Sequence, residues 1–503
     1  MAFVQNLPFF GIVLALFTGV LCSVMNRKVA RWICIGMITA QVIASLLVLL
    51  FVVNTGESYT YMMGHYPAPW GNEIRVGVLE ALIALFFAAI ELLSLVGGLK
   101  HIEHEVDEKK ENLYYTMLCL LTSSILALIY TNDLFTAFVF VEINTIAACG
   151  MIIIRQTGRS IAAGFRYMVM SLLGSGLFLI GICLTYDITG HLLMSNVKEA
   201  VAVLATTGEY SVPLTITIGL MAVGLSIKSA LFPFHTWLPD AHGSSTVTTS
   251  AILSALVSEV YMFLLIKIIY RVIGFDVVVA NRIMNVLFVF GLAAMVFGSL
   301  SALKERDIKR MIAFSSIAQF GYIFMGIGLG TKYGMIAALF HLFAHASGKA
   351  LVFVAQSGLV DANGGSRNLL KLKGTGFRNK VAGFTFAVGA LSMVGIPFFA
   401  GFVSKYNFAT AAVYSPNKMW LTLVVLALST ILNAMYFLRT VIRIYTPVDT
   451  SVHARLDGVK PPVIRTGKSF ALATLLMAII NIVLGTFSAP VMEMIARGLD
   501  MFS

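Results

Sequence analysis

The sequence predicts an all-α polytopic membrane protein, and three observations carry this prediction. Of the 503 residues, 58% are hydrophobic and only 12% are charged, whereas soluble domains carry about 25% charged residues. A hydrocarbon core about 30 Å thick requires about 20 apolar residues in a helix, and such runs recur along the whole chain. Lysine and arginine are concentrated in alternate gaps between these runs. An ordinary soluble enzyme and a disordered chain are therefore excluded.

The apolar runs predict about 14 transmembrane helices. The gaps between them are short, so no segment is long or polar enough to form a soluble domain. The predicted spans are residues 8–24, 32–53, 77–98, 113–131, 134–154, 163–186, 213–235, 247–270, 283–303, 310–328, 334–358, 382–404, 419–441 and 469–491.

The basic residues predict the orientation of the chain. Of the 30 lysine and arginine residues in the gaps or at the adjoining ends of the spans, 24 belong to loops after odd-numbered spans and 6 to loops after even-numbered spans. Because cytoplasmic loops carry an excess of basic residues, we expect the odd loops in the cytoplasm and both termini on the outer side of the cell membrane. The net charge of +11 then results from the excess of basic residues in these loops. We expect the lipid bilayer as a partner, and we expect no nucleic acid.

Several ionisable residues remain inside the apolar runs. Such a residue at membrane depth costs at least about 2.5–3.5 kcal/mol and marks an ion or proton path. The alternative is a structural ion pair, and a lysine near the end of a span, such as Lys267, can reach the interface. The residues inside the runs are Glu80, Glu91, Glu142, Lys228, Glu259, Lys349 and Lys405.

Two of these lysines lie beside helix breakers. Lys228 precedes Pro233 in the seventh span, and Lys405 follows Pro397 in the twelfth. Interrupted helices in corresponding positions of two halves indicate the ion path of a transporter. The spacing of five spans predicts two repeats, the second inverted. We expect an N-terminal three-helix segment (1–112), a first repeat (113–274), a second repeat (275–445), and a cytoplasmic loop with a C-terminal helix (446–503). The polar residues expected to line the first break are His235, Asp240 and His242.

The eleventh span carries a row of polar side chains. His341, His345 and Lys349 recur every four residues and share one helix face, which predicts a proton relay between the two broken helices. Two histidines at this spacing are also compatible with haem or a metal ion, but the third member of the row is a lysine. The five cysteines form no C-x-x-C pair, so we expect neither a cofactor nor a metal site.

Four stretches resemble one family of membrane subunits. They are FPFHTWLPDAH (232–242), DIKRMIAFSSIAQFGY (307–322), HLFAHASGKALVF (341–353) and GIPFFAGFVSKY (395–406). In this order they resemble the proton-conducting subunits shared by respiratory complex I, membrane-bound hydrogenases, formate hydrogenlyases and Mrp-type Na+/H+ antiporters. The segment GHYPAPWG (64–71) resembles the Mrp D subunit and its hydrogenase counterparts, so we expect the Mrp D-like branch.

The resemblance implies fourteen core helices, inverted repeats with broken helices 7 and 12, and a hydrophilic axis. It implies that Glu142 is the fifth-helix glutamate, Lys228 its lysine partner, and Lys349 the central lysine. The sequence departs from the family at the eighth helix. Glu259 stands where the family usually carries a lysine, and Ser254 stands at an earlier position that can hold a histidine. An acid there is compatible with a sodium-handling or modified path.

The predicted function is ion translocation, of H+ with Na+ as a second candidate, by one subunit of a multisubunit complex. That complex is either a Na+/H+ antiporter or a redox-driven assembly, such as a complex I-like enzyme, a hydrogenase or a formate hydrogenlyase. The redox centres of such an assembly would have to lie in its other subunits. Two other classes stay open, namely a haem or quinone enzyme that uses His341 and His345, and a structural scaffold.

Overall fold

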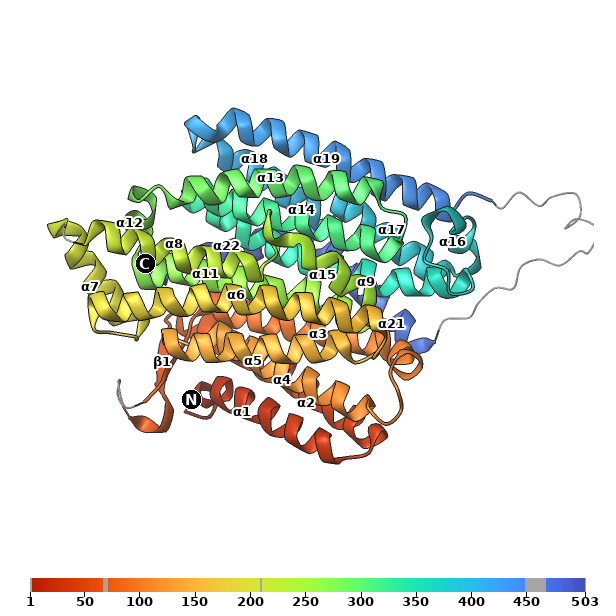
Figure 1. Cartoon of the computed structure of the whole chain (residues 1–503), viewed down its shortest axis with the longest axis horizontal. Coiled ribbons are helices and arrows are strands. Elements are labelled where there is room, and N and C mark those ends of the chain that lie inside the picture. The colour runs from red at the N-terminus through yellow and green to blue at the C-terminus, as the bar shows by residue number, and fades with distance from the viewer. Residues whose placement is uncertain (1, 67–70, 209, 448–466, 503) are drawn as a thin grey trace, which may run out of the picture.

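The computed structural model describes residues 2–66, 71–208, 210–447 and 467–502. Long helices lie side by side along one direction (Figure 1). Among the described residues, thirteen helices are long and apolar enough to cross a membrane. The predicted twelfth span is also helical but is divided into two shorter helices. The prediction of an all-α polytopic membrane protein is confirmed.

The N-terminal segment contains three long helices and a small hairpin. The helices are α1 (Ala2–Val24), α2 (Arg27–Thr55) and α3 (Val78–Glu105). An antiparallel hairpin of β1 (Tyr59–Met62) and β2 (Glu73–Val76), with the short η1 (Met63–His65), joins α2 to α3. Residues 67–70 of the GHYPAPWG segment lie outside the described residues. The hydropathy pattern does not reveal this hairpin, because its strands have only four residues each.

The next group of helices contains the first break. It comprises α4 (Glu111–Tyr130), α5 (Leu134–Ile153), α6 (Gly158–Thr189), the short amphipathic α7 (Met194–Thr207), α8 (Ser211–Lys228), η2 (Phe234–Thr236) and α9 (Trp237–Ser244). The seventh span therefore ends at Lys228 and not at residue 235. Pro233 has no backbone N–H to continue a helix, and Ala230 turns the chain with φ +53°.

The eighth span is one continuous helix with two wide turns. It is built from α10 (Val247–Ile252), the π-helical η3 (Leu253–Val257), α11 (Ser258–Ile268) and the π-helical η4 (Ile269–Ile273). A π-helical turn rotates the residues that follow it relative to those that precede it, and such turns are frequent at functional sites. Glu259 lies directly after the first of them.

The remaining helices contain the second break. They are α12 (Phe275–Ala280), α13 (Ile283–Lys304), α14 (Ile308–Gly328), α15 (Lys332–Ala362), η5 (Leu369–Lys371), α16 (Thr375–Arg378), α17 (Lys380–Val394), α18 (Ala400–Val413), α19 (Pro416–Ile444), α21 (Lys468–Thr486) and α22 (Ser488–Asp500). The chain unwinds between α17 and α18, where Pro397 lies. Residues 448–466 of the predicted cytoplasmic loop lie outside the described residues.

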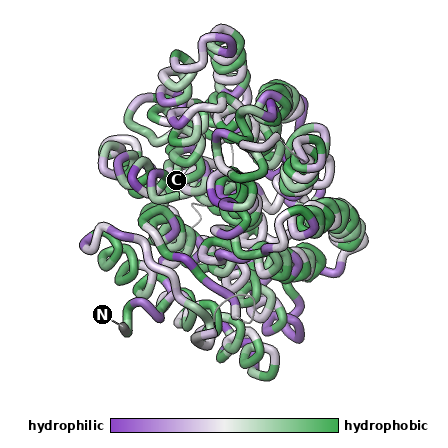
Figure 2. Tube along the Cα trace, turned by 90° about the vertical axis from the view of Figure 1, so that its left-hand side faces the viewer, coloured by the Kyte–Doolittle hydropathy of each residue, from purple (hydrophilic) through white to green (hydrophobic). Residues whose placement is uncertain are grey.

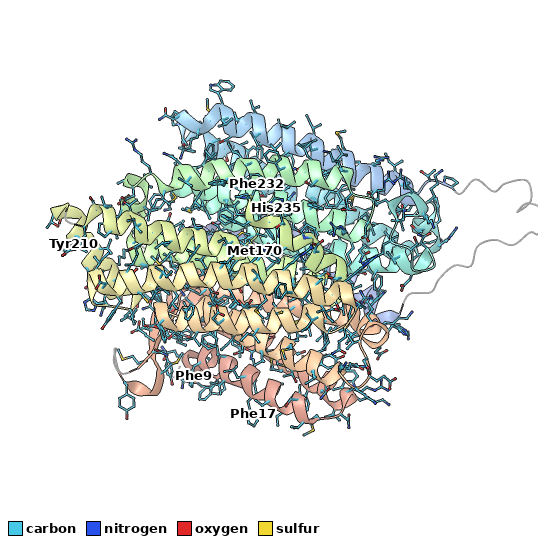
Figure 3. The ribbon with its side chains drawn as sticks, in the orientation of Figure 1. Phe9, Phe17, Met170, Tyr210, Phe232 and His235 are labelled. Atoms are coloured by element: carbon cyan, nitrogen blue, oxygen red, sulfur yellow. The ribbon has the colours of Figure 1, made fainter. Side chains whose placement is uncertain are left out.

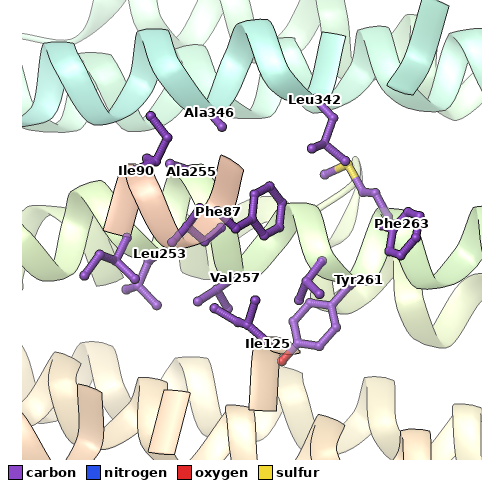
Figure 4. Close-up of a cluster of buried hydrophobic side chains, with 14 of the residues drawn as sticks. Phe87, Ile90, Ile125, Leu253, Ala255, Val257, Tyr261, Phe263, Leu342 and Ala346 are labelled. Atoms are coloured by element: carbon purple, nitrogen blue, oxygen red, sulfur yellow. The ribbon is translucent and has the colours of Figure 1, made fainter. Parts of the chain in front are cut away.

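The eighth span, α14 and α15 form the centre of the bundle and are almost entirely buried. Figure 4 shows apolar side chains of α3, α4, the eighth span and α15 meeting in one cluster that includes Phe87, Ile125 and Leu342. The outer helices instead expose large apolar side chains, such as Phe17 of α1 in Figure 3, and much of their length is hydrophobic in Figure 2. Polar groups on the central helices are therefore shielded from the lipid.

Candidate functional site

The first break holds Lys228 at the last residue of α8. Its side chain is 2% exposed, and its Nζ donates a hydrogen bond of 2.6 Å to Oγ1 of Thr145 on α5. The Nζ also lies 5.4 Å from the centroid of the Tyr261 ring. The ammonium group is therefore held by a neutral hydroxyl and an aromatic face, both from neighbouring helices.

Glu142 lies on α5 three residues before Thr145 but does not form the predicted contact with Lys228. Among the described residues no ion pair within 4.0 Å joins them, and Oε1 of Glu142 is buried without a hydrogen-bond partner. The hydroxyl of Thr145 takes the place expected for the carboxylate.

Tyr261 continues this polar region toward the centre of the bundle. Its hydroxyl donates to Oδ1 of Asn144 at 2.7 Å, and the amide of Asn144 donates to Oγ of Ser124 at 2.9 Å. The three side chains come from α11, α5 and α4. The sequence gives little signal for Tyr261, because an aromatic residue in an apolar run usually belongs to the core.

Glu259 contacts His345 at the centre of the molecule. Oε1 of Glu259 on α11 is hydrogen-bonded to Nδ1 of His345 on α15, and both side chains are fully buried. The other carboxylate oxygen and Nε2 of the histidine have no hydrogen-bond partner among the described residues. The acid that departs from the family pattern thus has an imidazole partner on another helix.

The three polar residues of α15 contact three different helices. His341 Nδ1 lies 2.7 Å from Oγ of Ser404 on α18, whereas His345 meets α11. Lys349 Nζ donates to the carbonyl of Ile312 at 3.0 Å and to the hydroxyl of Ser315, both on α14. At 3.6 residues per turn, four residues advance the direction of a side chain by about 40° beyond a full turn. The predicted row therefore spirals across the bundle and does not face a single neighbour.

At the second break, a backbone carbonyl group binds Lys405. Its Nζ donates to the carbonyl of Val394, the last residue of α17, at 2.7 Å. Carbonyls at the end of a helix have no intrahelical partner, so the lysine satisfies one of them. The Nζ also lies 5.5 Å from the centroid of the Tyr322 ring, which stacks on His341 at 5.3 Å between centroids. Lys405 is thereby connected to the row on α15.

Glycine geometry shapes this second break. Gly395 has φ +91°, in the region that side chains other than glycine rarely adopt. A Cβ atom on Gly395 would lie 2.8 Å from Cδ of Lys405. The absence of a side chain therefore permits both the turn and the close passage of the lysine stem. Pro397 lies within the unwound segment and has no backbone N–H that could continue a helix.

The predicted polar residues around the first break fall into two groups. His242 is fully buried, its ring stacks on Phe353 at 5.0 Å, and neither ring nitrogen has a hydrogen-bond partner among the described residues. His235 is less buried and stacks on Phe232 at 5.4 Å between centroids, and both residues are labelled in Figure 3. Both histidines lie next to the break, but among the described residues no hydrogen bond joins either of them to Lys228.

Asp240 belongs to an ion-pair network at one end of the bundle. It accepts hydrogen bonds from Arg166 and, at 2.6 Å, from Arg310, which also pairs with Glu305 at 3.1 Å. Burial opposes the charged form of Glu305, but the backbone N–H of Arg306 and the guanidinium of Arg310 outweigh it and lower the pKa of this carboxyl. Asp240 ties α9 to α6 and α14.

Three other charged residues of the apolar runs have structural partners. Glu80 pairs with Arg75 at 2.9 Å, and Glu91 accepts a hydrogen bond of 2.6 Å from Thr122. The expectation that Lys267 reaches the interface is wrong, because it is fully buried and donates to the carbonyls of Ile129 and Thr131.

Lys309, which the hydropathy pattern places in a loop, is also buried. It donates to the carbonyls of Ser245 and Thr246. Both unexpected lysines therefore bind carbonyls beside helix ends, where free acceptors are available.

Comparison with known proteins places these features in context. A family profile described as NADH:quinone oxidoreductase/Mrp antiporter, transmembrane, matches residues 131–432. The N subunit of the NADH-quinone oxidoreductase of Desulforudis audaxviator is 28% identical over 499 residues, covering 97% of each chain. The D subunit of the Na(+)/H(+) antiporter of Alkalihalophilus pseudofirmus is 26% identical, covering 71% of this chain and 70% of the antiporter chain.

A solved structure is also similar to the chain over its full length. The membrane-bound sulfane sulfur reductase, an archaeal respiratory membrane complex, contains a chain that superposes with a TM-score of 0.88 at 26% identity. The superposition covers 100% of this chain and 98% of the other. Thus similar chains occur in complexes described as respiratory and as antiporter assemblies.

Proposed function

Because the chain belongs to the NADH:quinone oxidoreductase/Mrp antiporter family of membrane subunits, we propose that it translocates protons along the buried residues from Glu142 to Lys405. It is an antiporter-like, multi-pass membrane subunit, and its relatives are subunits of multisubunit complexes. We propose that it acts within such a complex in the cell membrane.

The contact between Glu259 and His345 carries the proposal. It joins α11, in the half that contains Lys228, to α15, in the half that contains Lys405. A carboxyl group and an imidazole in contact exchange a proton readily when a neighbouring charge changes. Fully buried ionisable groups at membrane depth usually mark an ion path. A scaffold would gain nothing from placing such a pair between two broken helices.

The proposed mechanism is a stepwise rearrangement of charge. When Glu142 approaches Lys228, the carboxylate favours the protonated lysine; when the two separate, this attraction is lost. The amine then releases its proton through water and hydroxyl groups toward Glu259 and His345. The positive charge received there repels the proton on Lys349 and displaces charge toward Lys405. The lysine at the second break then releases a proton on the opposite side.

We also propose the orientation and the repeat boundaries given by the sequence. The bias of basic residues toward alternate loops supports a cytoplasmic position for the odd loops and an outer position for both termini. The breaks after α8 and α17, each with a lysine beside it, support repeats over residues 113–274 and 275–445. An inverted second repeat directs its break toward the opposite membrane face.

The driving reaction comes from the partner subunits. Similar chains are named both as NADH-quinone oxidoreductase and as Na(+)/H(+) antiporter subunits. The same buried row serves a gradient-driven antiporter and a redox-driven pump, because both change the charge at one end of the row. Protons are the proposed ion, with Na+ as the second candidate.

Transport by the whole complex in proteoliposomes tests the proposal. We expect an imposed gradient to drive H+ movement, and we expect Lys228→Ala to reduce it by at least about ten-fold, since a lost step of about 1.4 kcal/mol has this effect. Varying Na+ and pH separately identifies the exchanged ion. Intact transport in both the Lys228→Ala and the Glu142→Ala complex would refute the function.

A further inference from the structure

An apolar groove runs along the outward face of α19, a helix at one edge of the bundle (Figure 1). Its volume is about 640 Å³. Ile431, Met435 and Ile442 line it with exposed side chains. Ala434 lies between these larger residues and also lines the groove, so the floor is lowest where its side chain ends at Cβ. The groove is therefore shaped for an apolar chain.

Three basic residues line one end of this groove. Lys373 comes from the segment before α16, and Arg439 and Arg443 come from the last turns of α19. Within the described ranges, no acid pairs with any of the three at 4.0 Å or less. Arg439 and Arg443 also repel each other. A bound anion would relieve this repulsion, so the end of the groove favours a negatively charged group.

A polar cavity of about 270 Å³ adjoins the groove, because Arg439 and Arg443 line both. Two further basic side chains line the cavity, those of Lys304 and Arg306. Glu305 lines it too, but its carboxylate is paired with Arg310 at 3.1 Å. The groove and the cavity together thus offer an apolar part and a cationic part, which is the pattern that an anionic amphiphile requires.

The length of the groove matches one leaflet of a membrane. From Ile431 to Ile442 the helix rises about 16 Å, close to half of a hydrocarbon core of about 30 Å. Val424, farther along α19, is exposed but does not line the groove. A transmembrane helix of another subunit would contact both leaflets, whereas a lipid chain ends near the middle of the membrane. The length therefore favours a lipid.

Charge decides which lipid binds best. Lipid chains are as apolar as the groove, so moving a chain from the bilayer into the groove gains little. A guanidinium group binds phosphate through two parallel hydrogen bonds, and basic pockets beside transmembrane helices bind anionic headgroups. A zwitterionic lipid would bring its own ammonium group among these basic residues. The site should therefore select a lipid with a net negative charge.

We propose that the groove and the polar cavity form a binding site for one anionic phospholipid of the cytoplasmic leaflet. Its phosphate lies between Arg439 and Arg443, and one of its chains follows α19 to Ile431. The headgroup also binds Lys373 and so ties the segment before α16 to the end of α19. The choice of leaflet rests on the proposed orientation, whereas the lipid site itself does not depend on ion translocation.

Lipid binding by the purified whole complex tests the site. Native mass spectrometry counts the lipids bound during titration with phosphatidylglycerol or with phosphatidylcholine of the same chains. We expect one phosphatidylglycerol to bind at least about five-fold more tightly than phosphatidylcholine. Arg439→Gln combined with Arg443→Gln should weaken it by at least about ten-fold, because each basic residue near the membrane surface contributes about five-fold.

The matched control is Lys28→Gln combined with Lys109→Gln. It removes the same charge from exposed loop residues that line neither the groove nor the cavity, and it should bind phosphatidylglycerol as the unaltered complex does. Equal binding by the arginine variant and this control would overturn the site. Displacement of phosphatidylglycerol by an equal concentration of inorganic phosphate would also overturn it, because the site would then recognise a free anion.

Cross-linking in the membrane tests whether another subunit covers the groove. Met435→Cys is introduced into a chain whose exposed Cys183 is replaced by serine, and the thiol is modified with a benzophenone maleimide. Irradiation should attach it to lipid. Attachment to another subunit would show that protein fills the groove and would refute the lipid site.

Thermal unfolding provides a measurement that does not require counting lipids. A ligand that binds only the folded state stabilises it, so phosphatidylglycerol should raise the apparent midpoint of the unaltered complex and of the lysine control. The arginine variant should show a smaller rise. The Lys228→Ala complex should respond like the unaltered one, whether or not it transports protons. An equal rise in the arginine variant would contradict the site and leave the translocation function untouched.

Discussion

The two broken helices hold their lysines by different means. At the first break, a side-chain hydroxyl binds Lys228, and Glu142 lies on the same helix as that hydroxyl. At the second break, a backbone carbonyl binds Lys405, and no acid within the described ranges pairs with it at 4.0 Å or less. The first lysine can respond to the movement of an acid, whereas the second responds to the conformation of the chain that carries its acceptor.

The two breaks also differ in the residues at which the backbone turns with positive φ. The first turns at Ala230 with φ +53°, whereas the second turns at Gly395 with φ +91° and at Phe398 with φ +76°. Each break thus contains one residue other than glycine with positive φ, Ala230 in the first and Phe398 in the second. The second adds Gly395, where a Cβ atom would lie 2.8 Å from Cδ of Lys405. The lysine of the first break is thus bound by a side chain, and the lysine of the second by the backbone beside a glycine turn.

The largest expected difference between the breaks is their coupling to Glu142. Glu142→Gln removes the charge and keeps the shape, and we expect it to reduce H+ transport by about ten-fold, because it removes the attraction that tunes Lys228. In a double-variant cycle, Glu142→Gln should couple to Lys228→Met by about 1 kcal/mol or more, because methionine removes the charge that Glu142 attracts. Its coupling to Lys405→Met should be near zero. Equal coupling to both lysines would remove the distinction between the breaks.

A smaller effect is expected from the glycine of the second break. We expect Gly395→Ala to lower the free energy of unfolding by about 1–2 kcal/mol, because alanine is strained at positive φ. The close contact of the new methyl group with Lys405 should lower it by about 1–3 kcal/mol more. The matched control is Gly190→Ala, where φ is +72° and a Cβ atom would meet nothing within 4 Å. The apparent thermal unfolding midpoint of the purified complex compares the two.

We expect the midpoint to fall further for Gly395→Ala than for Gly190→Ala, with a loss of transport in the former alone. A similar fall in both, with normal transport, would show that the stem of Lys405 adapts to the added methyl group. The close approach would then play no part in positioning the lysine.

The fold could be predicted from the sequence because the membrane imposes a simple rule. A span needs a long apolar run, and the fourteen predicted runs are all helical, with the twelfth divided at its proline and glycines. The predicted seventh span extends to residue 235, beyond the end of α8 at Lys228, because residues 229–235 are largely apolar although they do not continue the helix. The β-hairpin, α7 and α22 escaped the prediction because short or amphipathic elements leave little hydropathy signal.

The site could be predicted only in part, because its contacts join distant segments. Burial of Lys228, Lys349 and Lys405 followed from the apolar runs around them. The contact of Glu259 with His345 did not follow, because it depends on how α11 and α15 pack and on the π-helical turn before Glu259. Lys267 and Lys309 lie near the ends of spans and resembled interfacial residues. Only the packed structure reveals that they bind backbone carbonyls.

We propose that the buried row conducts protons, and Lys349→Met tests this proposal most directly, since methionine keeps most of the length of the side chain and removes its charge. The matched control is Lys267→Met, another fully buried lysine that binds backbone carbonyls. In proteoliposomes of the assembled complex, we predict that Lys349→Met loses H+ transport and that Lys267→Met retains it in every complex that assembles. Undiminished transport in the Lys349→Met complex would contradict the account.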